Sequence, residues 1–260
     1  MKALELREAI ADHVLRLGHV RIEDLFAHFN ISRMTVHRHV DALAKQGVLR
    51  KLHGAVTAQP SGLYESAFSY RMTIAQPEKR ALARAALDYV EAGQAILIDE
   101  SSTVTALTTL LRAVTPITVA TNSVGAAAQL AQIEDVDLIS LGGNYSRVYN
   151  AYIGLICEQA IAKLRVNALI LSASAIQGAA AFIQDQQIVR VKQAMMAVAQ
   201  KRILLIDHFK FDRTALHMLA NLTDFDIVLS TDGLDAERRD TLLKSGVNLR
   251  IVPVTKADAK

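Results

Sequence analysis

Between residues 95 and 252, seven short and uninterrupted apolar runs alternate with stretches that repeat apolar residues at helical spacing. Strands buried on both faces read as continuous apolar runs, and an intervening helix brings the chain back so that successive strands run parallel. The sequence therefore predicts an α/β domain built on a parallel sheet. We expect strands at 95–98, 117–120, 138–141, 168–171, 203–206, 227–229 and 249–252, and helices at 104–111, 125–131, 152–164, 188–199 and 236–243.

Polar residues follow several of these runs directly. In open parallel sheets, ligands bind outside the carboxyl ends of the strands, so the residues after each run are the candidate ligand contacts. Hydroxyls and free N–H groups at helix N-termini suit an anionic oxygen such as that of a phosphate. Helix capping would equally explain the hydroxyls at 101–103, and a simple strand-end turn would explain the two glycines. The residues concerned are Asp99, Ser101, Ser102 and Thr103, then Thr121 and Asn122, then Gly142 and Gly143, and then Asp207 and Lys210.

The first 57 residues carry a different pattern. Apolar residues recur at helical spacing in two segments, and a tight turn at 30–32 precedes a third helix with Ser32 as its N-cap. Val36, Val40 and Leu43 form the core face of that helix, whereas Arg38 and Lys45 lie opposite. With two short strands at 48–51 and 53–56, this pattern predicts a winged helix-turn-helix. A three-helix bundle with a solvated charged face is the alternative.

Charge separates this module from the rest of the chain. Residues 1–57 contain nine Lys and Arg against six Asp and Glu, whereas residues 58–260 contain 20 of each. A basic module on a neutral body suggests a polyanionic partner such as nucleic acid, although an excess of three charges can arise by chance. We expect a helix-turn-helix domain over 1–57, a linker over 58–77 that contains Pro60 and Pro77, and an α/β domain over 78–260.

Composition excludes several classes of protein. The single cysteine, Cys157, rules out an internal disulfide and a multi-cysteine metal site, so we expect a reducing cytoplasmic location and a buried thiol. No apolar run approaches the roughly 20 residues that span a bilayer, so we expect no membrane association. His208 and His217 lack partners at metal-ligand spacing, and no phosphate-binding P-loop or dinucleotide fingerprint occurs. We therefore expect no metal and no cofactor.

The N-terminal residues resemble the signature of the DeoR family of bacterial repressors, which reads V-S-x-x-T-I-R-R-D-L. The corresponding stretch, 31–40, reads I-S-R-M-T-V-H-R-H-V, and Leu49-Arg50 and His53-Gly54-Ala55 follow as in the family. His37 replaces the first arginine, His39 replaces the aspartate, and one glycine follows His53 instead of two. The resemblance implies double-stranded operator DNA as a partner. The implied contacts are Ser32, Arg33, Thr35, His37, Arg38, Lys45, Arg50, Lys51 and His53.

The body resembles the sensor domain of the same family, which implies a Rossmann-like fold similar to phosphosugar isomerases. Motifs in the family order are Asp99 to Thr103, Thr121-Asn122-Ser123, Leu141-Gly142-Gly143, Tyr152-Ile153-Gly154, Lys192, and Asp207 to Phe211 with Lys210. Lys192 lies within a predicted helix, where a solvated surface position is equally compatible. The stretch 174–182 departs from the family, and Gln187 stands near a position that is usually acidic, with Asp185 as the alternative acidic residue. These departures affect the sugar end of the pocket more than the phosphate end.

The resemblance implies a transcriptional regulator, in particular a repressor of a carbohydrate operon, that works as a homodimer or homotetramer. Its effector would be a phosphorylated sugar or polyol. The implied contacts are Asp99, Ser101, Ser102, Thr103, Thr121, Asn122, Gly142, Gly143, Lys192 and Lys210. One alternative is a phosphosugar isomerase or deaminase with Asp99 or Asp207 as general base. Another is a DNA-binding protein whose body only oligomerises. We expect no enzymatic activity, because the attached helix-turn-helix makes sensing the better use of the body.

Overall fold

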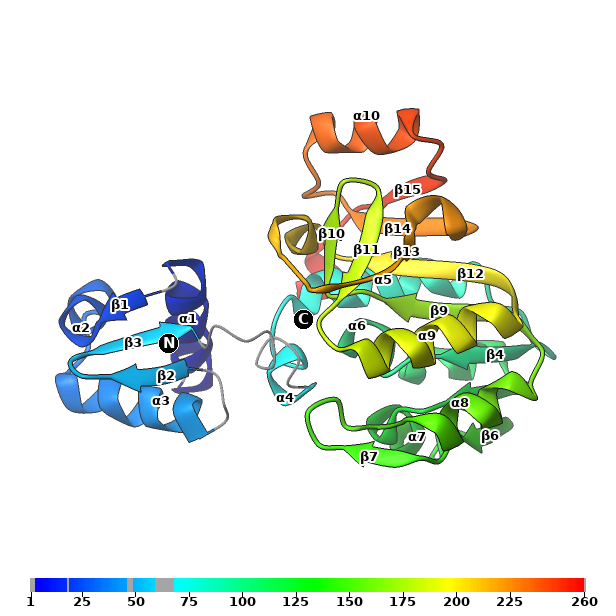
Figure 1. The fold of residues 1–260 in the computed structure, drawn as a ribbon, viewed down its shortest axis with the longest axis horizontal. Coiled ribbons are helices and arrows are strands. Elements are labelled where there is room, and N and C mark those ends of the chain that lie inside the picture. The colour runs from blue at the N-terminus through cyan, green and yellow to red at the C-terminus, as the bar shows by residue number, and fades with distance from the viewer. Residues whose placement is uncertain (1–2, 18, 46–48, 59–67, 260) are drawn as a thin grey trace. The chain divides into compact units, whose positions relative to one another are not determined.

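The computed structural model describes residues 3–17, 19–45, 49–58 and 68–259 (Figure 1). The chain divides into two compact units, Met1–Ile74 and Ala75–Lys260. Of the predicted linker, residues 59–67, with Pro60, lie outside the described part, and helix α4 (Phe68–Arg71) and the start of helix α5 (Gln76–Leu87) occupy much of the remainder. Among the described residues, no helix is long and apolar enough to cross a membrane, and no cluster of three or more His, Cys, Asp or Glu could hold a metal ion.

The first unit is a winged helix-turn-helix, as predicted. Its three strands form an antiparallel sheet in the order β1-β3-β2. Asn30 adopts a left-handed conformation (φ 49°) at the end of the second helix, and Ser32 Oγ accepts a hydrogen bond of 3.2 Å from the backbone N–H of Thr35 at the start of the third. The elements are α1 (Ala3–Leu17), β1 (His19–Arg21), α2 (Ile22–Phe29), α3 (Arg33–Lys45), β2 (Leu49–Leu52) and β3 (Ala55–Ala58).

The core of this unit consists of the apolar faces that helical spacing indicated. Val36, Val40 and Leu43 of α3 are buried against residues of α1, α2 and β3. The wing strands β2 and β3 are joined at His53 and Gly54, and they lie one or two residues later in the chain than predicted. The unit therefore presents the other side of α3 to solvent, with Met34 at 81% exposure.

The second unit is built on a seven-stranded sheet in the order β15-β14-β12-β9-β4-β5-β6, in which every pair of neighbours is parallel. All seven apolar runs predicted to be strands are strands. This confirms the predicted parallel α/β fold. The bounds are β4 (Ala95–Ile98), β5 (Ile117–Thr121), β6 (Val136–Ser140), β9 (Val166–Ser172), β12 (Ala199–Ile206), β14 (Ile227–Thr231) and β15 (Leu249–Val252).

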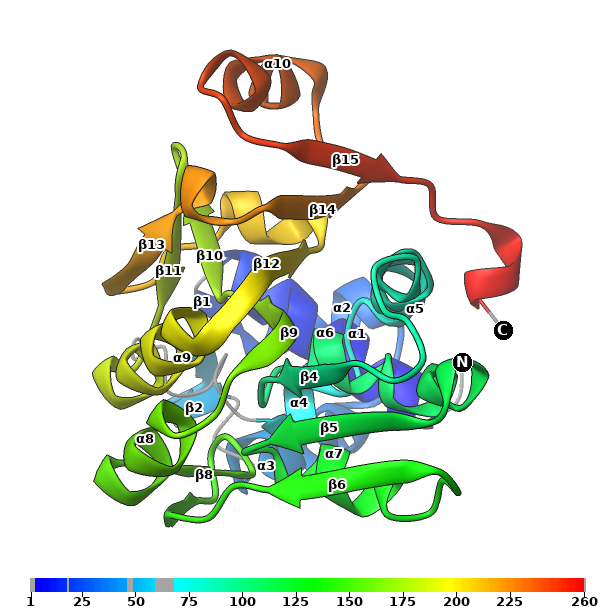
Figure 2. The ribbon, with the colours of Figure 1, turned by 90° about the vertical axis from the view of Figure 1, so that its right-hand side faces the viewer.

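Helices cover both faces of this sheet (Figure 2). Successive strand residues contribute to opposite cores: Leu97 packs with α8 (Leu155–Ala162) and α9 (Gln186–Val198), whereas Ile96 and Ile98 pack with α5 and α7 (Val124–Leu130). A strand whose two faces are both buried needs apolar residues at every position. The double covering therefore explains why the strands read as uninterrupted apolar runs.

Two predicted helices differ from the structure. The helix expected at 104–111 is a short α6 (Ser102–Thr105) followed by a 3-10 helix, η1 (Thr108–Val114). The helix expected at 152–164 begins later, because Tyr152 belongs to β8 (Ala151–Ile153), which pairs with β7 (Asn144–Ser146). The helical spacing was misleading at Tyr152 because a three-residue strand is too short to show its own period.

A second antiparallel sheet was not predicted. It comprises β10 (Ala175–Gln177), β11 (Ala180–Ile183) and β13 (His217–Asn221). β11 and β13 lie more than 30 residues apart in the chain, so no local pattern indicates their pairing. The remaining elements are η2 (His208–Asp212), η3 (Leu222–Asp224), α10 (Ala236–Lys244) and η4 (Lys256–Ala259).

Candidate functional site

The strand order reverses between β4 and β9. From β4 the chain proceeds outward through β5 and β6, and it then returns to β9 and builds the other half of the sheet through β12, β14 and β15. The loops at the carboxyl ends of two such strands diverge to opposite faces and leave a crevice in which open α/β sheets bind ligands. In this protein, the loop after β4 and the end of β9 carry the candidate site.

Asp99 is the centre of the hydrogen-bonded network at this point. It is fully buried directly after β4. Its Oδ1 accepts hydrogen bonds from the backbone N–H (2.9 Å) and the hydroxyl (2.6 Å) of Ser101, and its Oδ2 accepts from the backbone N–H of Ser172 (2.9 Å) and from Lys192 Nζ. Four donors thus fix this carboxylate, which joins the ends of β4 and β9.

Lys192 reaches the same network from α9. It is 1% exposed and forms ion pairs with Asp99 and, at 3.0 Å, with Glu100 Oε1. Burial disfavours its charge, but the two carboxylates outweigh burial and raise the pKa of Lys192 above its ordinary value. Lys192 is therefore a buried, charged residue, and the surface position that the sequence left open is wrong.

Lys210 supplies a second cation, from η2. Its Nζ lies 2.7 Å from Ser172 Oγ, 3.3 Å from Thr103 Oγ1 and 3.5 Å from Asp207 Oδ2. Unlike Lys192, it retains some contact with solvent, since its side chain is 12% exposed. The structure thus brings Lys210 together with hydroxyls from the ends of both β4 and β9.

The predicted hydroxyl residues 101–103 are all buried but differ in their contacts. Ser101 Oγ accepts a 3.3 Å hydrogen bond from the backbone N–H of Val104, so it caps α6, which is the capping role considered above. Thr103 contacts Lys210, and Ser102 is 5% exposed. Thr103 therefore has a contact that capping does not account for.

The strand-end residues of β5 and β6 form a separate set of contacts. Thr121 Oγ1 accepts from the backbone N–H of Ser123 (3.1 Å), and Asn122 Nδ2 donates to the carbonyl of Tyr152 (3.0 Å). At Gly143 (φ 148°), an added Cβ would lie 2.7 Å from the carbonyl oxygen of Ile153, so only glycine fits. Gly142 has no such neighbour. These contacts hold the β7–β8 hairpin near the carboxyl ends of β5 and β6.

Sequence reasoning missed Ser172 and Glu100. Ser172 ends β9, and its hydroxyl donates to the carbonyl of Leu205 (2.6 Å) while it accepts from Lys210. The search for polar residues after each apolar run would have found Ser172, because it follows the run at 168–171 directly. Glu100 adjoins Asp99, but no local pattern shows that Lys192, 92 residues later, is its partner.

The predicted nucleic-acid contacts gather on the outer side of α3 and on the wing. Two of the basic residues have acidic partners: Arg33 pairs with Glu23 at 2.6 Å, and Lys51 of β2 pairs with Asp41 of α3. The second pair links the wing to α3. The exposed candidates are Ser32, Arg33, Arg38, Lys45, Arg50, Lys51 and His53, and Thr35 and His37 are half-buried.

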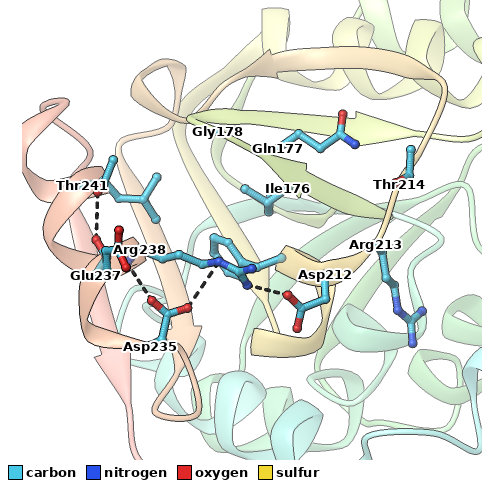
Figure 3. Close-up of a pocket in the computed structure, with 12 residues that line it drawn as sticks. Ile176, Gln177, Gly178, Asp212, Arg213, Thr214, Asp235, Glu237, Arg238 and Thr241 are labelled. Atoms are coloured by element: carbon cyan, nitrogen blue, oxygen red, sulfur yellow. Dashed lines mark hydrogen bonds and ion pairs between the residues drawn. The ribbon is translucent and has the colours of Figure 1, made fainter. Parts of the chain in front are cut away.

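A groove of about 890 Å³ lies elsewhere in the second unit, between β10, η2 and α10 (Figure 3). Arg238 extends across it and pairs with Asp212 (2.7 Å) and Asp235 (3.3 Å). None of the residues predicted to bind an effector lines this groove. The strand-end residues around Lys210 therefore form a candidate site for an anionic ligand that is separate from this groove.

Comparisons with known proteins match both units. A family model described as the DeoR C terminal sensor domain matches residues 74–232, and one described as the DeoR-like helix-turn-helix domain matches residues 7–61. The chain is 27% identical to the putative aga operon transcriptional repressor of Escherichia coli O157:H7, covering 95% of this chain and 93% of the relative. It is 31% identical to the L-fucose operon activator of Haemophilus influenzae (87% and 91%) and 28% identical to the glycerol-3-phosphate regulon repressor of Escherichia coli K12 (88% and 90%).

Proposed function

This chain belongs to the DeoR family of transcriptional regulators, and from that membership we propose that it represses a carbohydrate-use operon under the control of a phosphorylated sugar or polyol. Two of the relatives named above are repressors, of the aga operon and of the glycerol-3-phosphate regulon, and one is an activator, of the L-fucose operon. The basic helix-turn-helix binds operator DNA, and the α/β unit binds the effector. The effector releases the protein from operator DNA only if it binds more tightly to the conformation that does not bind DNA.

Operator binding uses the exposed side of α3 and the wing. Arg38 and Thr35 lie on α3 away from its buried Val36 and Val40 face. An exposed helix of this kind enters the major groove, where arginine can read a base edge or bind a phosphate. The wing supplies Arg50, Lys51 and His53 for backbone or minor-groove contacts. Their charge suits a polyanion whose affinity is governed largely by phosphate contacts.

The observation that carries the effector assignment is the position of Lys210 among hydroxyls at the switch point. A phosphate near neutral pH carries close to two negative charges, so neutral donors alone would leave much of its charge uncompensated. Lys210 supplies a cation that is partly exposed, and Ser102 and Thr103 supply hydroxyls from the start of α6. Lys192, which is closed off by two carboxylates, orients Asp99 instead of touching the phosphate.

We favour sensing over catalysis. Asp99, a candidate base for isomerase chemistry, already accepts four hydrogen bonds, and Asp207 lies against Lys210. A general base needs a free oxygen within reach of the proton that it removes. Turnover of sugar phosphates by the purified protein would overturn this part of the proposal.

The second unit also makes the protein a dimer or higher oligomer. One helix-turn-helix buries too little surface for tight binding, and paired half-sites one helical turn or more apart are the usual remedy. Light scattering at micromolar concentration checks this expectation. A monomer that still binds operator tightly would contradict it.

The effector site is tested by calorimetric titration of phosphorylated and unphosphorylated sugars into wild type, Ser102→Glu and Lys210→Ala. Phosphorylated ligands should bind better to wild type, and both substitutions should remove that preference while operator binding persists. Lys163→Ala, which removes an exposed lysine next to α8, is the matched control and should behave like wild type. Equal binding of neutral sugars, or a wild-type response from both variants, would show that the site is misplaced.

A further inference from the structure

Glu100 is a buried carboxylate that is only half satisfied. It is 2% exposed, directly after β4 at the switch point. Its Oε1 accepts from Lys192 at 3.0 Å, whereas its Oε2 has no hydrogen-bond partner among the described residues. A buried carboxylate oxygen without a donor is costly, and such oxygens in native proteins generally have a partner.

The charged residues around Glu100 do not fully balance its negative charge. Lys192 lies between two carboxylates, and the four donors to Asp99 saturate that group. Asp207 and Lys210 compensate each other. One negative charge therefore remains in this group, and it falls on the carboxylate that has a free oxygen.

Glu100 is also near residues around the carboxyl end of β6. Burial, together with the nearby charges of Glu100 and Glu158, raises the pKa of Cys157 on α8 to about 11. An added Cβ at Gly143, which follows β6, would lie 3.1 Å from Cys157 Cβ. Glu100 thus lies near both the Asp99–Lys192 pair and Cys157, which is itself next to Gly143 after β6.

We propose that Glu100 Oε2 accepts a hydrogen bond from the carbohydrate part of the effector, from a hydroxyl or an ammonium group, and so determines which phosphorylated sugars are recognised. This inference rests on the effector site proposed above. Lys192 orients the carboxylate by holding its other oxygen. A site with a buried acceptor discriminates strongly against a ligand that lacks the matching donor, because binding that ligand leaves the acceptor unpaired.

Glu100→Gln is a sharp test because Lys192 fixes the orientation of the new amide. An ammonium group only donates, so the glutamine oxygen must remain on the side of Lys192. The NH₂ group then occupies the position of Oε2, and an acceptor becomes a donor. Glu158→Gln is the matched control: the same substitution near Cys157, on a residue that pairs with Arg190 at 3.2 Å.

The ligands are inorganic phosphate, glucose 6-phosphate, 2-deoxyglucose 6-phosphate and glucosamine 6-phosphate, titrated into full-length wild type and both variants. We expect at least one hydroxylated or amino ester to bind wild type more tightly than inorganic phosphate. Glu100→Gln should reduce this difference in affinity between the ester and inorganic phosphate by about tenfold or more, without weakening the binding of inorganic phosphate. Glu158→Gln should keep the difference. Preference for the glucosamine ester indicates an ammonium donor, and preference for the glucose ester over the deoxy ester indicates a hydroxyl.

Three results would overturn the inference: an unchanged difference in Glu100→Gln, an equal loss of affinity for every ligand, or no ester that exceeds inorganic phosphate in wild type. Failure of wild type to bind any of these phosphates would instead overturn the effector site itself. If Glu100→Gln does not fold, Glu100→Asp keeps the charge but shortens the side chain, and it should lose the difference in the same way.

Discussion

The two regions that we assign to DNA and effector use lysine and arginine in opposite ways. On α3 and the wing, ion pairs such as Arg33–Glu23 leave their side chains 63% and 50% exposed, whereas Lys192 and its partners Asp99 and Glu100 are at most 2% exposed. Solvent screens exposed charges, which contribute little to stability but remain free to meet a long polyanion. Buried charges fix the positions of their neighbours, which is what recognition of a small ligand requires.

The largest expected effect comes from breaking the buried network. Lys192→Met leaves two buried carboxylates without their cation, so it should lower the free energy of unfolding of the second unit by about 3–5 kcal/mol. The matched substitution at the surface, Arg33→Met, should cost about 1 kcal/mol or less in the first unit. Denaturant unfolding followed by circular dichroism measures both. Similar losses for the two variants would remove the contrast between the regions.

An intermediate effect is expected on the DNA-binding side. Arg38→Ala should weaken specific operator binding by about 1–3 kcal/mol if the guanidinium reads a base, and it should leave the folding of the first unit unchanged because Arg38 is exposed. Fluorescence anisotropy with a labelled operator measures the affinity. Wild-type affinity in a folded Arg38→Ala protein would exclude this role for the residue.

The smallest expected effect concerns His39, the one buried polar residue of α3. Burial, together with the charges of Arg7 and Arg38, lowers the pKa of His39, so the folded unit binds a proton less readily than the unfolded chain. As the pH falls below about 6.5, the unfolded state takes up the proton first, and the first unit loses stability until the lower pKa of the folded state is reached.

The measurement is the free energy of unfolding of the first unit at pH 8 and pH 5. His39→Leu should reduce the difference between the two values. The same pH dependence in wild type and variant would exclude His39 as its source.

Local sequence patterns were sufficient to predict a strand or helix where the segment itself shows which of its faces are buried. The strand at 95–98 could be predicted to the residue because both of its faces are buried and every position is apolar. The third helix of the first unit could be predicted because Ser32 caps it and Val36, Val40 and Leu43 share one face. In both segments, backbone geometry converts sequence spacing directly into a buried face.

Helical spacing failed where elements are short or pair across the chain. It gave one long helix where β8 precedes α8, and it gave no sign of the sheet that joins β11 to β13. Three- to five-residue strands carry too few positions for a period, and their stability comes from partners distant in sequence.

The sequence alone determined the division into a basic helix-turn-helix and an α/β unit, the seven strands, and the set of strand-end residues. Only the tertiary structure decided what those residues contact. It separated the buried Lys192 from the partly exposed Lys210, added Ser172 to the site and showed the free oxygen of Glu100. The physical reason is that burial and charge pairing depend on side chains such as Asp99 and Lys192, which lie 93 residues apart and meet only when the sheet and α9 pack together.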